Sequence, residues 1–187
     1  MEQGWAVRMM GVLSLCVLGG CATTTVNFDT LPNGSPVTGQ SAPVLQGNAV
    51  SAQSLISHQY ASEGLTFSSG SPAVFAATFG PHDAPSAPNA ACPTQANGTA
   101  SYSNPTSIAV SQSNICNAWV TITKTSAPTT MTAFDISGNR IGPAVSSHGS
   151  SPTRAGVEER LHINACDIHR IVLTGSNYCF DDVSIRR

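Results

Sequence analysis

The sequence contains little charge of either sign. Of its 187 residues, 8 are Lys or Arg and 10 are Asp or Glu, and the formal net charge is -2. Lys124 is the only lysine. The chain therefore lacks the basic patch or stripe on which binding to a phosphate backbone depends, and we do not expect a nucleic-acid partner.

The sequence also lacks a long hydrophobic run and the common catalytic motifs. Its apolar run at Met9–Leu18 is too short to span a bilayer. There is no G-x-S-x-G nucleophile elbow, no H-E-x-x-H zinc motif and no P-loop. The closest set of histidines is His162 and His169 with Asp167, but the odd spacing places the two histidines on opposite faces of a strand. A small hydrolase is therefore the third of three function hypotheses.

The first twenty residues have the features of a signal peptide. Arg8 precedes the apolar run, which leads into Leu18-Gly19-Gly20-Cys21. This segment resembles the lipobox of bacterial lipoproteins, where a branched apolar residue and two small residues precede the cysteine that receives the lipid. The resemblance implies cleavage before Cys21, acylation of Cys21 and a stable membrane anchor. An ordinary secretory signal with a chance cysteine is the alternative.

The lipobox resemblance also divides the chain. It implies a signal peptide at 1–20, a lipidated tether at 21–25 and one domain at 26–187, which is long enough to bury a core. Ala22, rather than Asp, follows the cysteine. In a Gram-negative cell this implies sorting to the outer membrane.

Four cysteines remain when Cys16 and Cys21 are set aside: Cys92, Cys116, Cys166 and Cys179. An even number in an exported chain predicts two disulfides. We favour the pairs Cys92–Cys116 and Cys166–Cys179, because each closes a local loop and restricts the unfolded chain by about 3 kcal/mol. A metal site is the alternative, although no two of these cysteines have C-x-x-C spacing.

The rest of the chain has the pattern of many short strands joined by Gly, Pro and Asn turns. In Ile115–Thr123 the apolar residues Ala118, Val120 and Ile122 alternate with polar or aromatic ones, and a period of two indicates one buried face. Further strands are expected at Val26–Phe28, Glu63–Phe67, Ala73–Phe79, Ile108–Val110, Thr129–Ile136, Arg140–Ile141 and Val157–Ile163. Gly80–Asn97 is expected to be a long loop, and a helix over Val157–Val172 is the competing prediction.

The last segment predicts a hairpin and a contact between the two chain ends. Ile168–Thr174 and Tyr178–Ile185 are rich in β-branched and aromatic residues, and Gly175-Ser176-Asn177 lies between them. Asp181 and Asp182 interrupt the second apolar run, and a buried carboxylate needs a partner. The only similar feature is Asp29 near the start of the mature chain. We therefore expect both ends to lie in one sheet.

These strands and turns predict an all-β, antiparallel β-sandwich with one domain. Four segments together resemble the jelly-roll domains of galactose-binding and carbohydrate-binding-module type: Asn27–Asp29, Tyr60–Phe67, Ala133–Asn139 and Ile168–Val183. The resemblance implies a jelly roll that binds a ligand. It makes a binding or adhesion module the first expectation for function, with carbohydrate as the first ligand class.

The same resemblance implies a structural calcium ion. In such domains an acidic residue of the first strand and an Asp of the last strand often bind one calcium, and the matching residues here are Asp29 and Asp182, with Asp181 beside them. Asp29 stands where Glu is commoner, and its reach is shorter. The alternative is that these carboxylates accept backbone N–H bonds or face Arg186 and Arg187.

Trp119 is the candidate ligand-binding residue. It lies on the strand face opposite Ala118, Val120 and Ile122, next to Asn117, and an exposed Trp beside an amide can stack on a sugar ring while the amide binds its hydroxyls. The alternative is a Trp covered by a second layer. We therefore expect a non-catalytic, lipid-anchored module of the outer envelope that binds glycan, or else a structural envelope lipoprotein that binds a protein partner.

Overall fold

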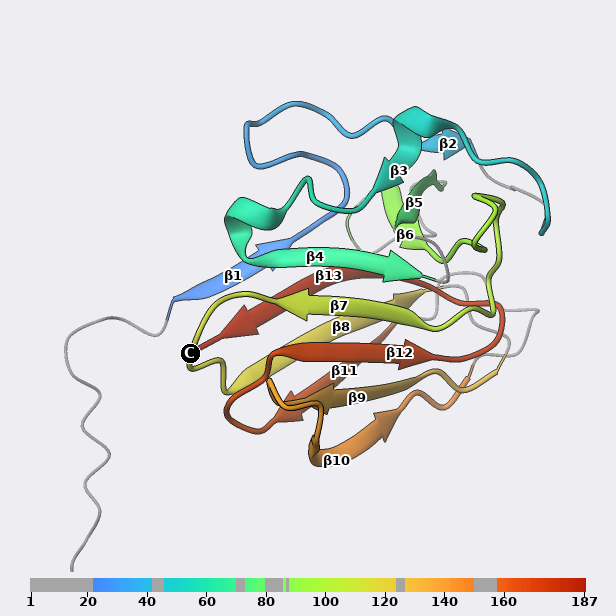
Figure 1. Ribbon diagram of the computed structural model, residues 1–187. Coiled ribbons are helices and arrows are strands. Elements are labelled where there is room, and N and C mark those ends of the chain that lie inside the picture. Colours follow the sequence, from blue (N-terminus) through green and yellow to red (C-terminus); the bar gives the residue numbers. More distant parts are fainter. Residues whose placement is uncertain are drawn as a thin grey trace, which may run out of the picture.

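The computed structural model describes residues 22–41, 46–69, 73–79, 86, 88–123, 127–149 and 158–187. Two sheets pack against each other (Figure 1), which confirms the predicted all-β sandwich. The first sheet has the order β11-β8-β13-β6-β5-β2, with β1 added on β13 and β3 on β5. The second sheet has the order β10-β9-β12-β7-β4. All pairings are antiparallel except that of β2 with β5.

The strands are short, and turns separate them. The first sheet contains β1 (Thr23–Val26), β2 (Gln40–Ser41), β3 (Leu55–Ile56), β5 (Val74–Thr78), β6 (Asn89–Cys92), β8 (Asn117–Thr123), β11 (Glu159–Asn164) and β13 (Cys179–Arg186). The second contains β4 (Leu65–Ser69), β7 (Thr106–Val110), β9 (Thr130–Phe134), β10 (Arg140–Ser146) and β12 (Arg170–Thr174). The helical elements of the described chain are the 3₁₀ turns η1 (Ala52–Ser54) and η2 (Ala61–Glu63). Neither is long enough to cross a membrane.

The core between the sheets is built around three phenylalanines. Phe28 follows β1, Phe67 lies in β4 of the opposite sheet, and Phe180 lies in β13. The ring of Phe28 meets the other two edge to face, with centroids 5.3 Å from Phe67 and 5.6 Å from Phe180. Edge-to-face pairs contribute beyond the area they bury, so this cluster holds the two sheets together.

The predicted meeting of the chain ends is confirmed. β1 pairs with β13, so that Val26 lies opposite Val183 and Thr23 lies opposite Arg186. The strand begins at Thr23, earlier than expected, and Thr23–Thr25 of the predicted tether therefore lie in the sheet. The predicted signal peptide and the predicted lipidation site Cys21 fall outside the described residues.

The predicted C-terminal hairpin is wrong. β12 pairs with β7 and β9 in the second sheet, whereas β13 pairs with β8, β6 and β1 in the first. The chain crosses between the sheets after β12, where the Tyr178 backbone N–H donates to Tyr102 O at 2.9 Å and its hydroxyl donates to Asn104 O at 2.7 Å. A turn signal marks where two strands are joined, but not whether they belong to one sheet.

The predicted loop over Gly80–Asn97 contains a strand. β6 (Asn89–Cys92) is buried along its whole length between β13 and β5. Its sequence Asn-Ala-Ala-Cys contains no β-branched or aromatic residue, and prolines flank it, so it carries no strand signal. The competing helix over Val157–Val172 does not form, since β11 and β12 occupy its described part.

The four predicted cysteines form two disulfides, but the predicted pairing is wrong. The bonds are Cys92–Cys179 and Cys116–Cys166, with sequence separations of 87 and 50. Cys92 ends β6 and Cys179 begins the neighbouring strand β13, whereas Cys116 and Cys166 flank the paired strands β8 and β11. Each bond therefore joins neighbours in the sheet rather than neighbours in sequence.

Candidate functional site

Side chains of three adjacent strands form one surface on the outer side of the first sheet. We call it the Trp119 face and define it by Asn117, Trp119, Arg160, His162 and Arg186. His162 of β11 lies opposite Trp119 of β8, and Arg186 of β13 lies opposite Asn117. Because side chains directly opposite each other on antiparallel strands are neighbours, these residues share one surface.

The predicted orientation of Trp119 is confirmed. Ala118, Val120 and Ile122 are buried in the core, whereas Trp119 faces away from it and is half-buried. The ring of exposed His162 stacks parallel to Trp119, with centroids 4.7 Å apart and planes at 7°. His162 thus covers one side of the indole and is itself exposed.

Asn117 is tied to the same aromatic pair. Its side-chain oxygen Oδ1 lies 3.1 Å from Nε2 of His162, and the residue is 9% exposed. The hydrogen bond fixes the His162 ring against Trp119. Asn117 is therefore a buried residue that positions the stacked pair.

Two guanidinium groups flank the same indole. Cζ of Arg160 lies 5.4 Å from the centroid of Trp119, and Cζ of Arg186 lies 5.2 Å from it. Both distances are within the range of cation–π attraction. Within the described chain neither guanidinium forms a hydrogen bond or an ion pair. The ion pair found there joins His148 to Glu159.

The three predicted calcium ligands lie near one another. Asp181 is fully buried and accepts hydrogen bonds at Oδ2 from Ser86 N at 3.0 Å and Ser86 Oγ at 2.8 Å. Its Oδ1 accepts a bond from Asp182 N at 2.8 Å, and Asn89 N donates to Asp29 Oδ1 at 2.8 Å. The carboxylates thus accept backbone N–H bonds, which is the alternative that the sequence left open.

Burial is costly for this carboxylate cluster. Desolvation raises the pKa of Asp181 to about 7, and repulsion from Asp182 adds to it against the hydrogen bonds from Ser86. Desolvation also raises the pKa of Asp29. No three His, Cys, Asp or Glu side chains converge as a metal site among the described residues. A cation here would need backbone carbonyl or hydroxyl oxygens as well.

A β-bulge explains why two adjacent carboxylates fit into an apolar strand. Between Asp181, opposite Thr121, and Ser184, opposite Trp119, β13 has one residue more than β8. The extra residue is Asp182, whose φ of 45° lies in the left-handed region. The bulge lets Phe180 and Val183 both point into the core while Asp181 and Ser184 point outward.

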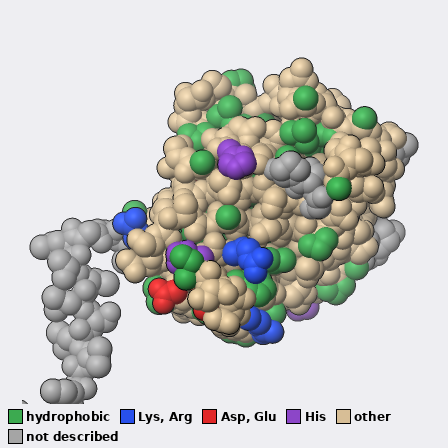
Figure 2. Space-filling model, in the orientation of Figure 1, with side chains coloured by type: hydrophobic (Ala, Val, Ile, Leu, Met, Phe, Trp, Pro, Cys, Tyr) green, Lys and Arg blue, Asp and Glu red, His purple; other side chains and the backbone are tan. Residues whose placement is uncertain are grey.

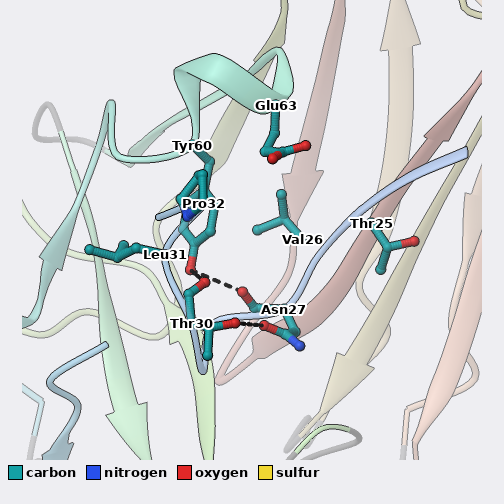
Figure 3. Close-up of a pocket in the computed structure, with 8 residues that line it drawn as sticks. All are labelled: Thr25, Val26, Asn27, Thr30, Leu31, Pro32, Tyr60 and Glu63. Carbon is teal, nitrogen blue, oxygen red and sulfur yellow. Dashed lines mark hydrogen bonds between the residues drawn. The ribbon is translucent and has the colours of Figure 1, made fainter. Parts of the chain in front are cut away.

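A small cavity lies between β1 and the 3₁₀ turn η2 (Figure 3). Its volume is about 190 Å³, and it is lined by Thr25, Val26, Asn27, Thr30, Leu31, Pro32, Tyr60 and Glu63. The Tyr60 hydroxyl is already engaged, at 3.0 Å from Asn27 O and from Thr30 O. The cavity is smaller than common ligand pockets. It contains a single carboxylate, whereas glycoside hydrolysis needs two.

The structure places His162 and His169, the closest pair in the sequence, in different sheets. His162 lies on β11 in the first sheet, while His169 lies just before β12 in the second. His148 is exposed and pairs with Glu159 at 2.7 Å. His82 and Asp83 of the proline-rich segment fall outside the described residues.

Comparisons with known proteins give weak structural similarities. No family model and no curated protein matches the chain. A mutant of the family 29 carbohydrate-binding module CBM29-2 is 9% identical, with a TM-score of 0.40, and the match covers 88% of this chain and 92% of that one. The K1 cleaved adhesin domain of Lys-gingipain from Porphyromonas gingivalis W83 is 10% identical, with a TM-score of 0.39 and coverage of 88% and 97%. The K3 domain of the same protein is 12% identical, with a TM-score of 0.36 and coverage of 88% and 91%.

Proposed function

We propose that this chain is a non-catalytic binding module of the bacterial outer envelope and that it binds carbohydrate on the Trp119 face. The observation that carries the proposal is the stacked pair of Trp119 and His162 on the outside of the sandwich. Sugars present a C–H face that packs on aromatic rings and hydroxyls that need donors and acceptors around them. The pair supplies the ring surface.

Neighbouring outward positions supply hydrogen-bonding groups. Asn164 is exposed and lies opposite Asn117. Thr25 is exposed two strands from Trp119, beyond Ser184, which is buried and whose hydroxyl lies 2.9 Å from that of Thr25. The surface beside the aromatic pair is therefore made of amides and hydroxyls. The molecule is largely uncharged elsewhere too, as the view in Figure 2 shows for one face. Such a surface suits a ligand rich in hydroxyls.

A protein partner is the weaker proposal. A docking surface for a protein is expected to show a contiguous apolar patch. Among the described residues, the exposed large hydrophobic side chain is that of Ile136, 80% exposed at the turn between β9 and β10. An isolated side chain does not form such a patch.

The lipid anchor is part of the same proposal. The lipobox motif before Cys21 supports it, and β1 begins at Thr23, two residues after that cysteine. An acylated Cys21 would hold the adjoining end of the first sheet close to the bilayer. The module would then present its ligand site near the membrane surface rather than on a long tether.

A structural calcium ion at Asp29, Asp181 and Asp182 is also proposed. Its support is the desolvated carboxylate cluster, because a divalent cation would favour the charged form of Asp181 that burial disfavours. The ion would stabilise the junction of the first and last strands and take no part in ligand chemistry.

Glycan-array binding followed by polysaccharide pull-down tests the carbohydrate proposal. The wild type is compared with Trp119→Ala and with a control, Phe134→Ala, which removes a half-buried aromatic ring beside Arg170 on the outer side of the second sheet. We expect Trp119→Ala to lose at least about tenfold in affinity, equivalent to about 1.4 kcal/mol. Phe134→Ala should bind as the wild type does. Equal retention of wild type and Trp119→Ala, or retention of neither, contradicts the proposal.

A further inference from the structure

We propose that the Trp119 face selects sugars that carry a carboxylate or a sulfate group, and that Arg160 and Arg186 recognise this group. The inference rests on the proposed carbohydrate function of the same face. It adds a charge requirement, which an aromatic platform alone does not impose.

Arg160 and Arg186 both lie around the ring of Trp119. Arg160 of β11 lies opposite Thr121, one outward position along from His162. Arg186 of β13 lies opposite Asn117, one outward position along from Trp119 in the other direction. The two therefore stand diagonally across Trp119. Both Cζ atoms lie within 5.4 Å of its centroid.

The N–H donors of both guanidinium groups are available to a ligand. Within the described chain their guanidinium groups make ring contacts but no hydrogen bond or ion pair. Arg140, in contrast, donates from Nε to Gly142 O at 3.3 Å. A guanidinium packed on an aromatic ring keeps its N–H edge for a ligand, and this planar fork matches a carboxylate or sulfate.

The acidic residues near the two arginines do not pair with them. Glu158 is exposed and lies two residues before Arg160, but it forms no ion pair with it in the described chain. Asp181 accepts hydrogen bonds from Ser86 and lies two strands away from Arg160, about 10 Å at the usual strand spacing. Glu159, next to Arg160 in sequence, is engaged with His148. Neither arginine of the face thus forms an ion pair with an acidic side chain of the described chain.

A neutral and an anionic ligand differ in the hydrogen bonds that they accept from arginine. Arginine has five donors and no acceptor, so a sugar hydroxyl can only accept from it, in a bond in which one partner alone is charged. A carboxylate or sulfate adds the attraction of opposite charges and can accept two parallel hydrogen bonds from one guanidinium. Two unpaired guanidiniums beside one sugar platform therefore favour an acidic sugar over its neutral analogue.

The test uses polysaccharides that differ only in charge. The probes are homogalacturonan with free carboxylates, the same polymer with its carboxylates methyl-esterified, dextran sulfate and dextran. The full chain is titrated with each at low and at high NaCl. Arg160→Gln and Arg186→Gln are compared with the control Arg170→Gln, whose guanidinium lies over Phe134 on the second sheet, Cζ 4.5 Å from the ring centroid.

We expect at least one acidic polymer to bind about tenfold more tightly than its neutral counterpart, with a difference that shrinks at high salt. Arg160→Gln and Arg186→Gln should each lose most of this difference, and Arg170→Gln should keep it. All three arginines are at least partly exposed, and melting curves verify that each variant is folded.

Three results would overturn the inference. Equal binding of acidic and neutral polymers, lost in Trp119→Ala, leaves the carbohydrate function standing and removes the charge requirement. An equal loss in Arg170→Gln shows attraction to overall charge and not to this face. Absence of binding to both acidic polymers rejects an acidic-sugar site, and the glycan array then decides separately whether a neutral sugar binds.

Discussion

The ring of Phe28 meets the ring of Phe180 edge to face, with centroids 5.6 Å apart and planes at 89°. Both side chains are fully buried. Phe28 lies two residues after Val26, the last residue that pairs β1 with β13, and Phe180 lies within β13. The first and last strands are thus joined twice, by a backbone ladder and by a core contact, and the sandwich depends on its two ends.

Truncating Phe28 should therefore destabilise the whole domain. Phe28→Ala removes a ring that contacts Phe67, Phe180 and Tyr60, and we expect a loss of about 3–5 kcal/mol in the free energy of unfolding, as is usual for a buried Phe. Urea denaturation measures it. The control Ile136→Ala, at a side chain that is 80% exposed, should change stability by less than about 0.5 kcal/mol. Similar losses in both variants would show that the core is not organised around Phe28.

The stability of the metal-free protein should fall as pH rises from about 4 to about 7. Burial raises the pKa of Asp181 from its ordinary value to about 7 in the folded state. The folded state then binds more protons than the unfolded state within this window, so its advantage is complete below the unfolded pKa and is lost as pH rises through the folded pKa. The raised pKa of Asp29 acts in the same direction.

The measurement is the free energy of unfolding against pH in the presence of a chelator. Each unit of pKa shift corresponds to about 1.4 kcal/mol, so the fall should amount to a few kcal/mol. Asp181→Asn should be less stable at low pH but should show a flatter profile. A wild-type profile that rises across this window, or one that the variant shares, would rule out Asp181 as the titrating group.

Added calcium should raise the melting temperature at neutral pH and flatten this pH profile. A cation held by Asp29, Asp181 and Asp182 would stabilise the folded state by about 2.7 kcal/mol at a concentration one hundred times its Kd. Mg²⁺ should not replace it, because it demands a tighter octahedral geometry. Asp182→Asn should abolish the shift, and Asp135→Asn, in the exposed turn after β9, should retain it. An identical melting temperature with calcium and with chelator would remove the metal proposal.

Local patterns predicted many of the strands, although not β6, and did not predict how all of them pair. The alternation around Trp119 gave the buried and outer sides of β8, and the two Phe-Asp segments gave the contact between the ends. Strand partners depend on the twist and closure of the whole sandwich. For this reason the turn between β12 and β13 does not show that they lie in different sheets, and sequence distance does not show that the disulfides join sheet neighbours.

The candidate site was predicted in part for the same reason. Trp119 and Asn117 follow from the period of one strand. Arg160, His162 and Arg186 were missed because they join the face only through the register of β11 and β13 with β8. The sequence of β11 does indicate its outer side, because Arg160, His162 and Asn164 alternate with buried Leu161 and Ile163.

The anchor should depend on Cys21 alone. Cys21→Ser removes the thiol that the lipobox motif assigns to acylation, and a chain without two or more acyl groups does not stay on a bilayer. We expect the variant in the soluble fraction after cell fractionation, whereas wild type sediments with membranes. Cys16→Ser, within the signal segment, serves as the control and should remain membrane-bound. Retention of Cys21→Ser in the membrane fraction would contradict lipidation.

The Cys116–Cys166 disulfide should support ligand binding as well as stability. It joins the residue before β8 to a residue just beyond β11, next to Asn117 and Asn164, and so holds the two strands that carry Trp119 and His162. Replacing both cysteines by Ser should lower the free energy of unfolding by about 4 kcal/mol, through the entropy of the open chain, and should also weaken glycan binding.

The matched control is the other disulfide, which fastens β6 to β13 away from the stacked pair. Replacing Cys92 and Cys179 by Ser opens a longer loop, with a sequence separation of 87 against 50, so the loss of stability should be at least as large. Glycan affinity of the folded fraction should nevertheless stay near the wild-type value. Equal losses of affinity in both double variants would mean that binding follows global stability, and that the edge of β8 and β11 does not need this bond to keep the Trp119 face in shape.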